Sequence, residues 1–209
     1  MRNRRSDVTA FRPAWFSRFR RDGRGVAIVE FAMVAPVLIL FYVGMAELCQ
    51  ALLAERKAAH AASAIGDLVA QADKTNAADV QEVFNIAEVI MKPYTTGTKL
   101  RVRVSSVKVG DDNVARVKWS DSKGWTDRAT NSVVTLPQVS SGGSTKAFLN
   151  KGESAVMSEV QYDYESGFSD LFVTVRAWFG GNAAEEGGYD FNSVHYLRPR
   201  KSEEVTYIS

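Results

Sequence analysis

The sequence predicts an α+β protein in which a long N-terminal transmembrane helix is followed by a small helix and an antiparallel β-sheet head domain. Three patterns carry this prediction: a run without charged residues over 31–46, apolar residues at helical spacing over 77–91, and apolar–polar alternation from residue 100. The chain has 209 residues, of which 45% are hydrophobic and 24% charged. This composition excludes a disordered chain, a collagen and a disulfide scaffold.

Charge is distributed unevenly along the chain. Residues 1–25 contain eight Arg and two Asp, a net charge of +6, which leaves −4 for the rest of the sequence. A basic segment before an apolar run orients a membrane helix with the basic side in the cytoplasm. We therefore expect a cytoplasmic leader over 1–25, a transmembrane helix over 26–71 and an extracytoplasmic head over 72–209.

The apolar segment is long enough to cross a bilayer. About 20 helical residues span a hydrocarbon core of about 30 Å, and residues 31–53 supply them. A buried core helix and a cleaved secretory signal are the alternatives, but the arginine-rich flank disfavours the first, and the length of the run and the lack of a small-residue cleavage site disfavour the second. Pro36 lies inside the helix, where it removes a backbone donor and is expected to cause a bend.

Glu30 is an unusual residue for the start of an apolar helix. A carboxylate inside a bilayer costs about 2.5–3.5 kcal/mol, so a compensating cation is expected. If the chain were cut between Gly25 and Val26, the new α-amino group of Val26 could pair with Glu30, either within the helix or in a neighbouring subunit. Such a pair would set the axial register of an assembly.

The pattern of a basic leader, Gly25 and the run VAIVEFAMVAP resembles a type IV prepilin-like signal. More narrowly, the stretch RRDGRGVAIVEFAMVAPVLILFYVGMAELCQALLAERKAA is similar to the TadE-like family, the minor pseudopilins of the tight-adherence (Tad) apparatus that builds Flp pili. The resemblance implies a pilin-like architecture and cleavage after Gly25 by a prepilin peptidase, with Glu30 as the residue read by the peptidase or the assembly. Phe31 stands where the Flp-type motif usually has Tyr, and Val26 where pilins commonly have Phe.

The resemblance also implies a set of partners. These are the prepilin peptidase, other pseudopilins, the major Flp pilin, the inner-membrane secretion platform and the lipid bilayer. The protein would be a single-pass inner-membrane protein with a cytoplasmic N-terminus and a periplasmic or extracellular head, or would associate with the pilus. The basic, aromatic leader could in principle bind nucleic acid, but its attachment to a membrane helix makes the anionic inner leaflet the expected partner, and we expect no nucleic acid.

The remaining sequence predicts the elements of the head. Asn76 is placed to cap a helix over 77–91, which Pro93 ends. A β-hairpin is expected over 100–105 and 114–119, with the turn at 110–113. Further strands are expected at 155–164, 171–179 and 191–197, after an interruption at 140–146. The sheet is expected to pack on the second helix or on the upper half of the first.

Candidates for chemistry are few. His60 and His195 are the only histidines and Cys49 the only cysteine, so we expect no catalytic site, no metal and no cofactor. The acidic turns at 111–113 and around Glu185, Glu186 and Asp190 could bind calcium or be plain solvated turns. The aromatic residues of the second half are expected in the sheet core, with an exposed subset as a partner surface; they are Tyr162, Tyr164, Phe172, Trp178, Phe179 and Tyr189.

Two other functions compete with a pseudopilin. One is a signal-anchored, single-pass extracytoplasmic binding domain that does not enter pili and recognises a ligand through its aromatic sheet. The other is an anchored hydrolase that uses acidic residues such as Asp163 or Glu165. The first hypothesis requires an N-terminus at Val26, whereas the binding domain keeps its leader.

Overall fold

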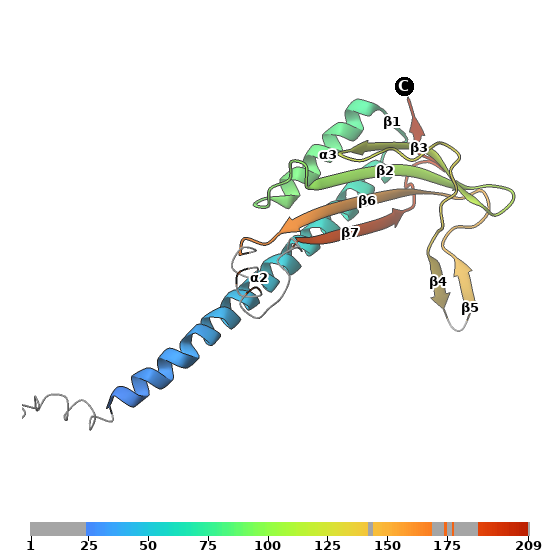
Figure 1. Cartoon of the computed structure of the whole chain (residues 1–209). Helices are drawn as coiled ribbons and strands as arrows, with labels where there is room; N and C mark the ends of the chain where they lie inside the picture. The colour runs from blue at the N-terminus through green and yellow to red at the C-terminus, as the bar shows by residue number, and fades with distance from the viewer. Residues whose placement is uncertain (1–23, 142–143, 169–173, 175–176, 178–187, 209) are drawn as a thin grey trace, which may run out of the picture. The chain divides into compact units, whose positions relative to one another are not determined.

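The computed structural model describes residues 24–141, 144–168, 174, 177 and 188–208 (Figure 1). The chain divides into two compact units, Met1–Ala46 and Glu47–Ser209. The boundary lies inside the first described helix. The C-terminal part of that helix therefore belongs to the unit that contains the sheet.

The first helix, α2, covers Arg24–Ala70 and confirms the long helix predicted from the sequence. Its interior contains Pro36 and continues through it. In the first unit, every described residue of 26–46 is exposed or half-buried. In the second unit, the helix buries small side chains at a spacing of three and four residues, which places them on one face. They are Ala51, Ala54, Ala58, Ala61 and Ala62.

The second helix, α3, covers Ala77–Met91, as the sequence predicted. It begins where Asn76 accepts a hydrogen bond from the backbone N–H of Asp79, at 2.9 Å. It ends before Pro93, and Lys57 of α2 donates hydrogen bonds to the carbonyls of Ile90, at 3.3 Å, and of Lys92. A cationic side chain thus satisfies orphan carbonyls at the C-terminal end of α3.

Four antiparallel strands form the sheet of the head, in the order β3-β2-β6-β7. The predicted hairpin of β2 and β3 is confirmed, and a bulge opposite Ser106 and Val107 shifts the register of β3. Two small pairs complete the head: the hairpin β4-β5 and the parallel pair β1-β8. The strands are β1 Lys74–Thr75, β2 Leu100–Val109, β3 Ala115–Lys123, β4 Gln138–Ser141, β5 Ser144–Ala147, β6 Ser154–Glu165, β7 Gly188–Leu197 and β8 Thr206–Tyr207.

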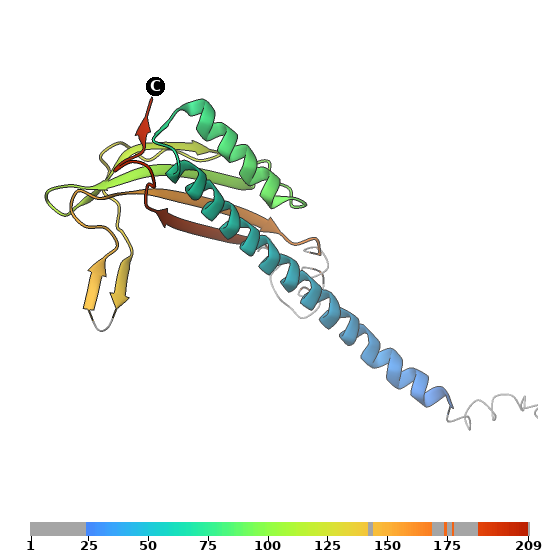
Figure 2. The same cartoon turned by 180° about the vertical axis from the view of Figure 1, so that it is seen from behind.

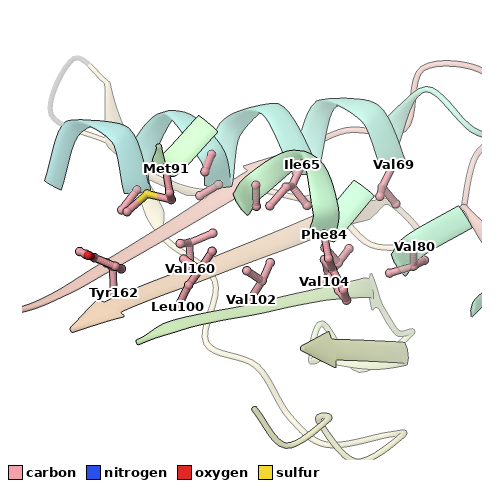
Figure 3. Packing of buried hydrophobic residues seen from close by; sticks show 14 of the residues in the cluster. Ile65, Val69, Val80, Phe84, Met91, Leu100, Val102, Val104, Val160 and Tyr162 are labelled. Atoms are coloured by element: carbon pink, nitrogen blue, oxygen red, sulfur yellow. The ribbon is translucent and has the colours of Figure 1, made fainter. Parts of the chain in front are cut away.

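Both helices cover the same face of this sheet within the unit Glu47–Ser209 (Figures 1 and 2). Their buried residues pack with Leu100, Val102 and Val104 of β2 in one core cluster, in which Phe84 and Ile65 are fully buried (Figure 3). A second, smaller cluster lies on the other face, around Val107, Val117 and Met157. The sheet therefore packs apolar residues on both faces, and α2 and α3 lie on one of them.

Some sequence expectations differ from the structure. The strand expected at 171–179 is wrong at Thr174 and Ala177, which are helical, and its other residues lie outside the described residues. The segment 140–146, read as an interruption, contributes to the β4-β5 hairpin, in which Ser140 pairs with Thr145 and Ser141 with Ser144. β1 and β8 were not predicted, since two-residue strands have no periodicity.

Candidate functional site

The predicted processing residues lie at the beginning of the described part of α2. Gly25, Val26, Glu30 and Phe31 are all exposed, and 58% of Val26 and 69% of Phe31 are accessible to solvent. Val26 and Glu30 are separated by four helical residues, so they share one face. The geometry leaves both accessible for a contact with another molecule, and their role in processing stays a prediction.

Residues 26–46 form an apolar surface around the whole helix. Glu30 is the only charged residue of this segment, and 21 helical residues rise about 31 Å, close to the thickness of a hydrocarbon core. By length and composition, α2 can cross a membrane. Pro36 is exposed in this segment, and the bend expected there stays a prediction. An N-terminal apolar helix of this kind indicates a single-pass membrane anchor.

Glu47 marks the point at which α2 joins the folded head. Only 7% of this residue is exposed, and its carboxylate accepts a hydrogen bond of 2.7 Å from the hydroxyl of Tyr164 in β6. Three residues later, the hydroxyl of Tyr94 donates to the backbone carbonyl of Gln50, at 3.0 Å. Burial and the hydrogen bond to Glu47 both raise the pKa of Tyr164, so this tyrosine stays protonated and donates.

Further along the helix, Gly66 allows close approach of the sheet. A Cβ atom at this position would lie 2.4 Å from Cδ1 of Leu197 in β7 and 3.2 Å from Cβ of Ser158 in β6. The neighbouring Ile65 and Ala62 are fully buried. The small residues of α2 thus bring the helix backbone near the sheet, and this face is committed to the head rather than to lipid or a partner.

The opposite face of the sheet contains a buried charge cluster. Glu159 of β6 accepts hydrogen bonds from Arg103, at 2.7 Å, and from Arg128, at 2.8 and 3.0 Å. Arg103 also donates to the carbonyl of Thr126 and lies over the ring of Trp125, 4.1 Å from its centroid. Burial by itself would raise the pKa of Glu159, but the two arginines outweigh it and hold the pKa below its ordinary value. The carboxylate is therefore fully compensated, which is typical of a structural ion pair.

The acidic turn at 111–113 is occupied by protein cations. Asp112 forms a bidentate pair with Arg116, at 2.6 and 2.9 Å, and Asp111 lies 3.2 Å from Lys151. Among the residues that the structure describes, no group of three potential metal ligands occurs. Glu185 and Glu186 lie outside the described residues, and Asp190 accepts a hydrogen bond from Gln161.

The residues considered for hydrolysis are also paired. Asp163 forms an ion pair with Arg101, at 2.5 Å, and Glu165 with Lys99, at 2.7 Å. A hollow of about 300 Å³ is lined by nine residues and contains neither carboxylate; its lining consists of Val109, Asn113, Ala115, Val134, Leu136, Gln138, Leu149, Asn150 and Lys151. Within the described parts of the chain, these two carboxylates therefore do not face a common hollow.

The histidines and aromatic residues are dispersed. His60 is exposed on α2 and His195 is half-buried in β7. Tyr162 and Tyr164 are buried, as expected for the sheet core, whereas 55% of Tyr189 is exposed. Phe172, Trp178 and Phe179 lie outside the described residues.

Sequence reasoning missed Glu47, Gly66 and Glu159. Glu47 ends the apolar run, and a charge followed by alanines at a spacing of three and four could have indicated the start of a buried face. Gly66 lies within a continuous helical pattern, where a lone Gly often marks a close packing contact. Glu159 had no local signal, because its partners lie on other strands and loops.

The comparisons with known proteins concern the first part of this structure. Residues 25–66 match the family model described as TadE-like protein, and no curated protein or solved structure matches the chain. The matched residues run from Gly25, through the apolar surface and Glu47, to the close contact at Gly66. The resemblance predicted from the sequence is thereby confirmed for residues 25–66, and the chain carries a TadE-like segment.

Proposed function

We propose that this protein is a non-enzymatic minor pseudopilin that takes part in assembly and secretion of Flp-type pili, and that it is processed between Gly25 and Val26. The observation that carries the proposal is the match of residues 25–66 to the TadE-like family, combined with Glu30 near the start of an exposed apolar helix. The apolar surface of 26–46 would pack laterally against other pilin-like helices and lipid.

The position of Gly25 favours processing there. Gly is less favourable than Ala in a helix by about 1 kcal/mol, so the first turn of α2 can unwind around the Gly25–Val26 bond at low cost. Cleavage creates an α-amino group on Val26, which is a cation at neutral pH. In an assembly, this cation pairs with Glu30 of an adjacent helix and sets the register between subunits, and in lipid the pair removes the cost of an isolated carboxylate.

The proposed partners follow from this role. The leader and the first turn of α2 are read by the prepilin peptidase, and residues 26–46 contact other pseudopilins, the major Flp pilin and the inner-membrane platform. The N-terminus lies in the cytoplasm and the head outside the inner membrane. This orientation is supported by the net charge of +6 over residues 1–25.

Intact-mass measurement of the membrane-extracted protein tests the proposal, after co-expression with a prepilin peptidase of a tight-adherence system. The expected mature chain begins at Val26, and Glu30→Ala is expected to insert normally but to impair maturation or pilus output. Glu55→Ala is the matched control, because Glu55 is exposed on the same helix beyond the apolar segment. An intact leader in the wild type, with normal insertion, would instead identify a signal-anchored extracytoplasmic binding domain.

A further inference from the structure

We propose that the outer edge of β7 binds an extended segment of another protein, which adds one strand to the sheet of the head. The segment alternates apolar residues, which face α2, with polar or basic residues on the other face of the sheet. This contact goes beyond the helix packing proposed above, because it is made by the folded unit Glu47–Ser209 alone.

The two edges of the four-stranded sheet are covered differently. At the β3 edge, the backbone of residues 131–134 pairs with the strand. The N–H of Val117 donates to the carbonyl of Ser132 at 3.0 Å, and the N–H of Val134 donates to the carbonyl of Ala115 at 2.9 Å. Within the part of the chain that the structure describes, no strand pairs with the outer side of β7 (Figure 1). The open edge of the sheet is therefore the one that β7 forms.

The hydrogen bonds of β6 show which backbone groups of β7 point outward. The N–H of Asp163 donates to the carbonyl of Lys99, so the odd-numbered residues of β6 bond towards β2 and the even-numbered ones towards β7. Val160 is opposite Ser193, so the odd-numbered residues of β7 bond to β6. The even-numbered residues of β7 therefore direct their N–H and C=O groups away from the sheet. They are Gly188, Asp190, Asn192, Val194 and Tyr196.

β7 lacks the features by which edge strands commonly avoid pairing, which are proline, lysine, a bulge or a very short length. Its sequence contains no proline, lysine or arginine, and its ten residues pair with β6 in one continuous register. The covered edge strand, β3, in contrast contains Arg116, Lys118 and Lys123 and has a register shift against β2. A long, regular edge without these features is suited to the addition of a strand.

The helix α2 lies along β7 on one face of the sheet. Near one end of the strand, Glu47 contacts Tyr164, whose partner across the ladder is Tyr189. Near the other end, Gly66 lies against Leu197. The rise from Glu47 to Gly66 is about 28 Å along a helix, and Tyr189 and Leu197 are about 27 Å apart along a strand. The helix and the strand therefore lie side by side over this whole length.

The side of α2 next to β7 exposes two leucines. Leu48, Leu52 and Gly66 follow one another at about one and four helical turns, so they lie on the same side of the helix. Solvent reaches 58% of Leu48 and 47% of Leu52. Gln50 and Lys57, which contact the C-terminal end of α3 and the residues after it, lie on the opposite side. Every second side chain of a strand added to β7 would therefore face the two leucines.

An extended segment is the occupant that these features favour. Backbone donors and acceptors that point outward at every second residue match the backbone of another strand, and the leucines favour apolar side chains on the face towards α2. On the other face, Asp190 is the only charged residue of β7, which favours a basic residue opposite it. A helix or a small ligand would cover the leucines without using the outward backbone groups.

The test uses the full chain in mild detergent and, as the probe, a synthetic peptide of about ten residues in which valine and lysine alternate. Two further peptides carry N-methyl groups, one on the lysines and the other on the valines. In an antiparallel strand whose valines face α2, the N–H groups of the lysines bond to β7 and those of the valines point away. Methylation of the lysine nitrogens should weaken binding about tenfold or more, whereas methylation of the valine nitrogens should change it less than about twofold.

Asn192→Pro makes the matching change in the protein. It removes one outward N–H group and leaves the bonds to β6, because proline is tolerated on an edge strand where its nitrogen faces solvent. Asn192→Ala is the control, since it keeps the N–H group. The first variant should bind the unmethylated peptide about tenfold or more weakly, and the second within about twofold of wild type. Leu52→Ser, at an exposed position, should weaken binding about threefold and remains informative if Asn192→Pro does not fold.

Amide hydrogen exchange locates the bound peptide. The amides of Asn192 and Val194 should exchange rapidly in the free protein and become protected when the unmethylated peptide is added. The proposal is overturned if this peptide does not bind, if the two methylated peptides bind equally well, or if protection appears elsewhere. It is also overturned if these amides are protected before peptide is added, as a second copy or another segment of this chain on the edge would produce. Cleavage after Gly25 is measured separately, so neither result decides the other.

Discussion

Replacing the buried carboxylate of Glu159 by an amide should destabilise the head strongly. The change Glu159→Gln removes the charge shared by Arg103 and Arg128, whose side chains are 10% and 31% exposed, while that of Glu159 is only 6% exposed. Breaking a buried ion pair by removing one partner typically costs 3–5 kcal/mol. Because the amide oxygen can still accept one hydrogen bond, we expect a loss of about 3 kcal/mol.

The chain offers a closely matched control for this substitution. Glu165 lies on the same strand and pairs with Lys99, the residue before β2, at 2.7 Å, but its side chain is 69% exposed. An exposed pair contributes about 0–1 kcal/mol, so Glu165→Gln should change stability by less than about 1 kcal/mol. The two variants differ in burial and in the number of arginines that contact the carboxylate.

Urea unfolding of the full chain in mild detergent measures the difference. Tryptophan fluorescence is a suitable signal, because Trp125 lies against Arg103 and Trp119 is buried. With a slope of about 2 kcal/mol/M, the loss in Glu159→Gln lowers the urea midpoint by about 1.5 M. Equal midpoints for Glu159→Gln and Glu165→Gln would refute the assignment of the cluster as a stabilising ion network.

The destabilisation caused by Glu159→Gln should decrease as the pH is lowered. The folded-state pKa of Glu159 lies below its ordinary value of 4.5, so its contribution to stability is present above that pH and is lost as the pH falls through the folded-state pKa. The difference in the free energy of unfolding between wild type and Glu159→Gln should therefore become smaller in acid. If this difference in free energy stays constant at pH values well below 4.5, the carboxylate of Glu159 is not ionised in the native head.

The remaining predictions concern helix contacts, and urea unfolding of the full chain in detergent measures all of them. Gly66→Ala should cost about 1–2 kcal/mol, because its Cβ meets Leu197, and combining it with Leu197→Ala should relieve that clash; additive effects of the two substitutions would contradict the contact. Tyr164→Phe should cost about 1.5–3 kcal/mol by leaving buried Glu47 without its donor, and an unchanged midpoint would show that another group compensates it. Asn76→Ala should cost about 1 kcal/mol through loss of the cap of α3, whereas Asn76→Asp should retain most of that energy.

The elements predicted correctly from the sequence are those with local signals. The length of α2, the cap and spacing of α3 and the hairpin of β2 and β3 each depend on residues within one segment. The sequence predicted packing of the sheet on the second helix or on the upper half of the first, but not which residues of the first helix make that contact, because hydropathy treats lipid and a protein core alike. Alanines such as Ala54 and Ala58 look as apolar as the leucines beside them, yet they are buried in the head while Leu52 and Leu53 are exposed.

The residues of the candidate site also fall into those with a local sequence signal and those without one. Gly25, Val26 and Glu30 are recognisable from the sequence because their signal is a short motif, and the family match includes them. The Glu47–Tyr164 hydrogen bond and the cluster around Glu159 join residues far apart in the chain, so their pairing requires the sheet register. No spacing rule within one segment could have found them.

The pairing of β1 with β8 has a consequence for the order of events during biosynthesis. Val205 is fully buried beside β8, and its carbonyl accepts the indole N–H of Trp119 at 2.7 Å, while Thr206 and Tyr207 pair with Lys74 and Thr75. A nascent chain that has passed Lys74 therefore keeps this corner of its core open until residue 207 has been synthesised. During that interval Trp119 and the neighbouring apolar surface are available to chaperones or to non-native partners, so a slow end of synthesis would expose the protein to aggregation more than a slow start would.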